Sequence, residues 1–145
     1  MNDDAPGGGL DRFLQAQETT FEAALRELTA GRKTSHWMWF VFPQIAGLGR
    51  SETARFYAIG DLDEARAYLA HPVLGERLRG CVRALLEHRD RSARAILGDP
   101  DDLKLCSSLT LFETASTGDD DRRLFADALN AFFAGRRDGA TLGRV

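Results

Sequence analysis

The spacing of hydrophobic residues along this chain predicts α-helices from Leu10 onward. Between residues 10 and 31, the hydrophobic side chains recur at steps of three and four, which places them on one face of a helix. The positions on this face are Leu10, Leu14, Gln17, Phe21, Ala24 and Leu28. Gly31 follows as a residue suited to ending a helix. One helix is therefore expected over residues 10–31, with the polar Gln17 on its buried face.

The segment from Ser35 to Pro43 is unusual because residues 37–42 are all hydrophobic. Ser35 can cap a helix at its start, and Pro43 stops it. A segment this short could also form a buried strand. A helix is favoured because the neighbouring segments have helical patterns and no second strand candidate exists to pair with it. We expect a helix that is hydrophobic on all sides and lies in the middle of the domain.

Start and stop signals mark the remaining helices. Ser51 suits a helix N-cap, Asp61 and Glu64 match a capping box, and Pro72 suits the first position of a helix. The predicted elements are helices over 51–59, 61–70 and 72–86, a short turn over 93–97, a helix that begins at 99–100, and a long helix from 119 to 133. The pattern predicts an all-α fold, a single compact orthogonal bundle of about seven to eight helices over residues 10–145. Residues 1–9 are expected to form a flexible leader.

Composition narrows the class of protein. The 145 residues suffice for one sizeable core and are too few for two. A net charge of -3 gives no basic face for nucleic acid, and no segment has the ~18 apolar residues that cross a bilayer. Cys81 and Cys106 form no CxxC pair and lie in apolar patterns, which indicates buried, reduced thiols. We expect a cytoplasmic protein without nucleic-acid or membrane partners; the pattern does not indicate its oligomeric state.

The usual sequence motifs of nucleotide, metal and acyl-transfer sites are absent. The histidines, His36, His71 and His88, do not have the spacing of metal ligands. We therefore predict no metal site and no cofactor. Motifs alone leave open whether the chain is an enzyme.

Two polar residues flank the aromatic segment. His36 and Gln44 can offer hydrogen bonds at the two ends of a pocket wall made by Trp37 and Trp39. The alternative is a core segment in which His36 has a structural role. Gln17 raises the same question, because a buried amide without partners costs about 1–3 kcal/mol. Its partners are the indole N–H groups, the backbone or a ligand.

A second polar group lies in the helix that begins at residues 99–100. Lys104 is one of only two lysines in the chain, and Ser107, Ser108 and Thr110 follow it within two turns. Hydroxyl residues are poor helix formers unless something holds them. A lysine beside hydroxyls can bind an anion such as a phosphate or a carboxylate. The alternative is an ordinary solvent-exposed stripe.

The same short residue spacing occurs twice in the chain, before two predicted helix starts. Gly98 and Asp101 have the same spacing as Gly135 and Asp138. The simpler interpretation is that each glycine ends one helix and each aspartate lies in the first turn of the next. A pair of equivalent ligand-binding loops is the alternative.

Five stretches carry a family resemblance: RFLQAQ, SHWMWFVFPQIAGLGRS, HPVLGERL, GDPDDLKLCSSLTLF and GRRDGATL. They resemble the bacterial family known as domain of unknown function 1810, some members of which are labelled calpastatin. The resemblance covers nearly the whole chain from Leu10 and implies an all-α domain, but no established activity. The residues that match the family pattern are Gln17, His36, Trp37, Trp39, Pro43, Gln44, Ser51, His71, Pro72, Lys104, Ser107 and Thr110.

These observations favour a module that binds a small anionic or nucleotide-like ligand. Its expected contacts are Gln17, His36, Trp37, Trp39, Gln44, Lys104, Ser107 and Thr110. One alternative is an enzyme in which His36 acts as general acid or base on Ser107 or Ser108, which requires the two groups within hydrogen-bond reach or one water apart. Another is a domain that binds a protein partner through an exposed hydrophobic patch.

Overall fold

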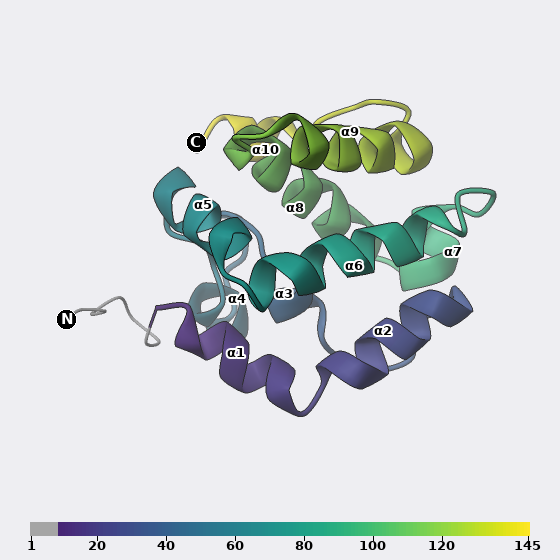
Figure 1. The fold of residues 1–145 in the computed structure, drawn as a ribbon, viewed down its shortest axis with the longest axis horizontal. Helices are drawn as coiled ribbons and strands as arrows, with labels where there is room; N and C mark the ends of the chain where they lie inside the picture. Colours follow the sequence, from purple (N-terminus) through teal and green to yellow (C-terminus); the bar gives the residue numbers. More distant parts are fainter. Residues whose placement is uncertain (1–8) are drawn as a thin grey trace.

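The computed structural model describes residues 9–145, and this part of the chain forms ten α-helices (Figure 1). They are α1 (Asp11–Glu18), α2 (Phe21–Ala30), α3 (Met38–Val41), α4 (Glu52–Phe56), α5 (Leu62–Ala70), α6 (Leu74–Leu86), α7 (Ala93–Leu97), α8 (Asp101–Ala115), α9 (Asp119–Phe133) and α10 (Gly139–Leu142). The predicted all-α class is confirmed. The leader expected over residues 1–9 lies outside the described residues, apart from Gly9.

Helix α8 is the centre of this arrangement. It packs against α5, α7, α9 and α10, whereas α1 and α2 lie on the side of the molecule opposite α9 (Figure 1). Every residue from Ser107 to Phe112 is buried, so α8 has no solvent-exposed face over this stretch. The sequence pattern assigned this central place to the aromatic segment instead. The helical stretch that is enclosed on all sides is thus the one that carries the serine and threonine hydroxyls.

The prediction of a single helix over residues 10–31 is wrong, because the helix is interrupted at Thr19 and Thr20. The Thr20 hydroxyl donates to the carbonyl oxygen of Ala16 at 2.6 Å. β-Branched residues with such local hydrogen bonds weaken a helix interior. Two helices, α1 and α2, therefore replace one, and α2 ends as predicted at Gly31, which has the left-handed φ of 78°. This break and the short α7 and α10 explain why the helices outnumber the expected seven or eight.

The aromatic segment is buried as predicted, but its conformation differs. Only Met38–Val41 is helical, Trp37 and Phe42 lie outside the helix, and Ile45 forms an isolated parallel bridge with Ile59. Ser35 does not cap the helix; its hydroxyl donates to Glu27. Because Glu27 also accepts the backbone N–H groups of Thr34 and Ser35, it holds this stretch in a non-helical conformation.

The helix starts predicted from capping residues are confirmed at Ser51 and Asp61 and are shifted by two residues at Pro72. The Ser51 hydroxyl accepts the N–H of Ala54 at 3.1 Å, and Asp61 accepts the N–H of Glu64 at 2.9 Å. Helix α6 begins at Leu74 rather than at Pro72, because His71 Nδ1 accepts the N–H groups of Val73 and Leu74. Caps depend on neighbours in sequence, and for that reason they are visible in the sequence.

Candidate functional site

Gln17 has a structural role in the core. Its side chain is buried, with 1% exposed. Its amide nitrogen donates to the carbonyl oxygen of Phe40 at 2.7 Å and to the Tyr68 hydroxyl at 3.0 Å. Arg77 donates to its amide oxygen at 3.3 Å. The amide thus has protein partners for both of its ends, and it joins α1 to α3, α5 and α6.

Trp37 is fixed by a buried carboxylate that the sequence analysis missed. The indole N–H donates to Glu27 at 2.9 Å, and Glu27 also accepts from Thr34 N, Ser35 N and the Ser35 hydroxyl. Burial acts to raise the pKa of Glu27, but these hydrogen bonds outweigh it and lower the pKa from 4.5 to about 2. Glu27 directly precedes Leu28 of the hydrophobic face of α2, and this polar residue next to that face was the available signal.

His36 lies on the surface, in the non-helical stretch before α3. Within residues 9–145, no hydrogen bond joins His36 to Ser107 or Ser108. The Ser107 hydroxyl lies 2.9 Å from Asp138 Oδ2 instead. The enzyme alternative therefore lacks the direct contact between imidazole and hydroxyl that it needs.

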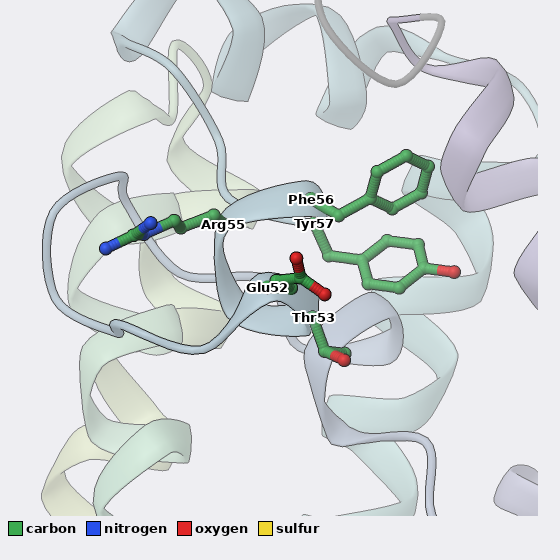
Figure 2. Close-up of a pocket in the computed structure, with 5 residues that line it drawn as sticks. All are labelled: Glu52, Thr53, Arg55, Phe56 and Tyr57. Carbon is green, nitrogen blue, oxygen red and sulfur yellow. The ribbon is translucent and has the colours of Figure 1, made fainter.

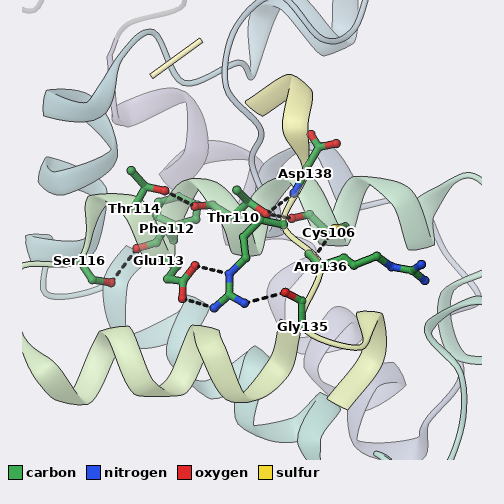
Figure 3. A network of polar contacts seen from close by, with 10 residues as sticks. Cys106, Thr110, Phe112, Glu113, Thr114, Ser116, Gly135, Arg136 and Asp138 are labelled. Carbon is green, nitrogen blue, oxygen red and sulfur yellow. Dashed lines mark hydrogen bonds and ion pairs between the residues drawn. The ribbon is translucent and has the colours of Figure 1, made fainter. Parts of the chain in front are cut away.

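Thr110 is fully buried, and its hydroxyl has protein partners on both sides. It donates to the carbonyl oxygen of Cys106 at 2.8 Å and accepts the backbone N–H of Asp138 at 2.9 Å (Figure 3). Nearby, Arg137 Nε donates to Glu113 at 2.9 Å, which ties the loop after α9 to α8. Thr110 thus holds the segment that carries Asp138 against α8, and its hydroxyl has no remaining role as a ligand contact.

Gln44, Lys104 and Ser107 come together in one cleft of about 300 Å³, which we call the α8 cleft. Three segments build it: the loop after α3, the first turns of α8 and the start of α10. The lining residues are Gln44, Leu48, Gly49, Pro100, Leu103, Lys104, Ser107, Asp138 and Ala140. Trp39 supports Lys104 from beside the cleft, since the Lys104 ammonium lies 4.5 Å from the centroid of the indole ring.

The two lysines of the chain share one carboxylate. Lys33 Nζ lies 2.8 Å from Asp101 Oδ2, and Lys104 Nζ lies 3.3 Å from Asp101 Oδ1. The Lys33 side chain is only 8% exposed, and its ammonium also lies 5.2 Å from the centroid of the Trp37 ring. Because one carboxylate faces two ammonium groups, Asp101 does not neutralise Lys104. Together, Lys33, Asp101 and Lys104 carry one net positive charge beside the α8 cleft.

Asp138 is a cleft residue that the sequence analysis did not select. Its Oδ2 accepts from the Ser107 hydroxyl at 2.9 Å, from Thr141 N at 3.2 Å and from the Thr141 hydroxyl at 2.5 Å. Its Oδ1 forms no hydrogen bond within residues 9–145. Figure 3 shows the carboxylate directed away from Thr110. One oxygen of Asp138 is thus fixed by the fold, and the other has no hydrogen-bond partner among the described residues.

The predicted structural basis of the repeated Gly–Asp spacing is confirmed only in part. Gly98 directly follows α7 and Asp101 is the first residue of α8, whereas the left-handed residue that ends α9 is Ala134 and not Gly135. Gly98 and Gly135 adopt the positive φ values of 85° and 78°, and Asp138 caps α10. The two loops nevertheless meet at the same cleft, because Asp138 lines it and Asp101 pairs with Lys104. This repeated spacing was the signal in the sequence that could have identified Asp138.

Comparison with known proteins gives the family. A family model described as "Protein of unknown function (DUF1810)" matches residues 8–145. The chain belongs to this family. It is also similar to the crystal structure of the conserved hypothetical protein Rv1873 from Mycobacterium tuberculosis, with 46% sequence identity, a TM-score of 0.88, and coverage of 92% of this chain and 94% of that chain. A search of curated proteins found no match.

A hollow larger than the α8 cleft lies elsewhere on this DUF1810 protein, on α4. It measures about 610 Å³ and is lined by Glu52, Thr53, Arg55, Phe56 and Tyr57. All five residues belong to one short stretch of chain, and Figure 2 shows Arg55 directed away from the two aromatic rings. Phe56 is 46% exposed. Because polar groups from separate elements do not converge here, the α8 cleft is the better candidate site.

The thiols and possible metal ligands give no competing site. Cys81 and Cys106 are both free, and burial raises the pKa of Cys81 to about 12, so this thiol stays protonated at neutral pH. Cys106 is only partly buried, contrary to the expectation. Residues 9–145 contain no group of three or more His, Cys, Asp and Glu residues placed to hold a metal ion. Over the same residues, no helix is long and apolar enough to cross a membrane.

Replacing Ser108 with alanine is expected to stabilise this DUF1810 protein by about 1 kcal/mol. Ser108 is 1% exposed, and its hydroxyl lacks a partner within the described residues. An unpaired buried hydroxyl is costly, and alanine favours a helix. Urea unfolding measures the change. Ser107→Ala is the matched control and should destabilise, because it removes the hydrogen bond to Asp138. A loss of stability in Ser108→Ala would contradict the prediction.

Proposed function

We propose that this DUF1810 protein binds a small anionic metabolite in the α8 cleft. One observation carries the proposal: three polar residues selected from the sequence, Gln44, Lys104 and Ser107, line the same cleft although they come from separate segments. A volume of about 300 Å³ is small for a ligand pocket, which favours a small metabolite over a large cofactor.

Lys104 is the group suited to contact the anion. Its ammonium has three donors, of which Asp101 takes one at 3.3 Å, and the Trp39 ring faces it from one side. The side chain is 23% exposed, so a ligand can reach it while much of the surrounding water is excluded. Lys33 pairs more closely with Asp101, at 2.8 Å, which leaves the charge of Lys104 available.

The other residues that were predicted to contact the ligand have supporting or structural roles in this proposal. Trp39 supports Lys104, whereas Gln17, Trp37 and Thr110 stabilise the fold around the cleft. His36 is outside the cleft lining and carries no role in the proposal. The alternative of a protein-binding domain stays a prediction without a specific contact in its favour.

The proposal is tested by titration with adenosine 5′-monophosphate, ribose 5-phosphate and inorganic phosphate, read by tryptophan fluorescence. Trp39 should report binding, because an anion at Lys104 changes the charge above its ring. We expect Lys104→Met to raise the Kd at least about tenfold, since a charge-assisted hydrogen bond is worth about 1.5–3 kcal/mol.

Arg66→Met is the matched control for the loss of one positive charge. Arg66 lies on α5, is 46% exposed in its side chain, and does not line the cleft. Its Kd should match that of the unchanged protein. If none of the three probes alters the fluorescence at millimolar concentration, or if both variants weaken binding equally, the proposed function is wrong.

A further inference from the structure

We propose that the ligand of the α8 cleft carries vicinal hydroxyl groups beside its anionic group, as a phosphorylated ribose does, and that Asp138 and Gln44 bind these hydroxyls. This inference rests on the proposed function and names the class of ligand. It follows from groups in the cleft that Lys104 alone does not explain.

The first observation is that the α8 cleft contains a fixed negative charge as well as a positive one. Asp138 is held by the N–H and hydroxyl of Thr141, by the Ser107 hydroxyl, and through its own N–H by Thr110. All of the hydrogen bonds to its carboxylate end on Oδ2. Oδ1 can therefore accept hydrogen bonds from a ligand, and it repels a bare anion. A simple anion is attracted by Lys104 but repelled by Asp138.

The second observation concerns Gln44. Gln44 lines the cleft, and its side chain forms no hydrogen bond within residues 9–145, although its backbone oxygen accepts the N–H of Ile59 at 2.8 Å. The free amide offers both a donor and an acceptor. A hydroxyl also donates and accepts, so it can pair with Gln44 and donate to Asp138. An ammonium group has donors only and leaves the amide N–H groups of Gln44 without a partner.

The third observation is the apolar part of the lining. Leu48, Pro100, Leu103 and Ala140 surround these polar groups. Such a wall suits the carbon skeleton of a sugar or the face of a base, because ligand pockets combine apolar walls with a few placed polar groups. A ligand with phosphate at Lys104 and a ribose at Asp138 and Gln44 uses the charged group of Lys104, the unpaired oxygen of Asp138 and the amide of Gln44.

The test compares ligands that differ only in their hydroxyls. Adenosine 5′-monophosphate should bind about tenfold more tightly than 2′,3′-dideoxyadenosine 5′-monophosphate, because the hydroxyl bonds to a carboxylate are charge-assisted. This comparison needs no variant. Equal affinity for the two nucleotides overturns the inference.

Asp138→Asn provides the second arm. The amide oxygen can replace Oδ2 as the cap of α10, and the amide nitrogen then replaces Oδ1 with a donor. We expect the preference for adenosine 5′-monophosphate over the dideoxynucleotide to disappear and the affinity for inorganic phosphate to rise several-fold. A purely structural role of Asp138 predicts weaker binding of every probe, and that result contradicts the inference.

Asp61→Asn is the matched control, because Asp61 caps α5 in the same way and does not line the cleft. It should leave all affinities unchanged. If all phosphates bind alike and depend on Lys104, the proposed function stands and the inference fails. If no probe binds, the proposed function fails and the inference fails with it.

Discussion

Replacing Arg12 with methionine is expected to lower the free energy of unfolding by about 3–5 kcal/mol. Arg12 is 5% exposed and holds α1 against the chain around α4 and α5. Its Nε donates to the carbonyl oxygen of Phe56 at 2.8 Å, and its Nη2 donates to that of Ala58 at 2.7 Å. The guanidinium also pairs with Glu64 at 3.2 Å and donates to Gly9. Methionine fills the space but leaves these carbonyl groups without the guanidinium donors, and it leaves the Glu64 carboxylate with the N–H of Gly60 but without its positive partner.

Urea unfolding at pH 7 measures this loss. Arg66→Met again serves as the control, since its exposed pair with Asp63, at 3.7 Å, should contribute less than about 1 kcal/mol. A change below 1 kcal/mol in Arg12→Met would show that water replaces the guanidinium at no cost, and the prediction would then be wrong.

Glu27→Gln is expected to destabilise the protein by about 3 kcal/mol at pH 7 and by almost nothing near pH 2. The pKa of Glu27 falls from 4.5 to about 2 on folding, so the folded state favours the ionised carboxylate. The resulting stability is present above pH 4.5 and is lost as the pH falls toward 2. Glutamine resembles the protonated acid, and the two proteins should therefore converge in acid.

The measurement is urea unfolding of both proteins at several pH values between 7 and 2. Glu22→Gln is the control on the same helix, because Glu22 is exposed and only faces the helix N-terminus. Its effect should stay below about 1 kcal/mol. A constant difference between Glu27→Gln and the unchanged protein across this pH range would contradict the assignment of the ionised carboxylate to the folded state.

The parts of the fold that could be predicted are those set by neighbours in sequence. Gly31, Ser51 and Asp61 end or begin helices as expected, because each acts on backbone groups within four residues. The break at Thr19 and Thr20 escaped prediction, since the three- and four-residue steps continue across it. The shape of the aromatic segment depends on Glu27, which precedes Trp37 by ten positions, and hydrophobicity alone does not report that contact.

The difference between local and distant contacts also explains which residues of the candidate site could be predicted. Lys104, Ser107 and Gln44 stood out because polar residues interrupt apolar patterns, and the fold brings them to one cleft. Asp138 has an ordinary explanation as a helix cap, which concealed its free oxygen. His36 was selected for its place beside Trp37, but the turn before α3 directs it to the surface. Adjacency in sequence does not determine which side of a non-helical segment faces the cleft.

The carboxylate shared by Lys33 and Lys104 makes the α8 cleft sensitive to events in the core. Lys33 lies immediately before the stretch that Glu27 holds, so loosening that stretch would also loosen Lys33. Asp101 would then pair with Lys104 alone and neutralise the charge that the proposed function assigns to ligand binding. A core substitution far from the cleft can therefore weaken binding, and such an effect would not be evidence that the substituted residue contacts the ligand.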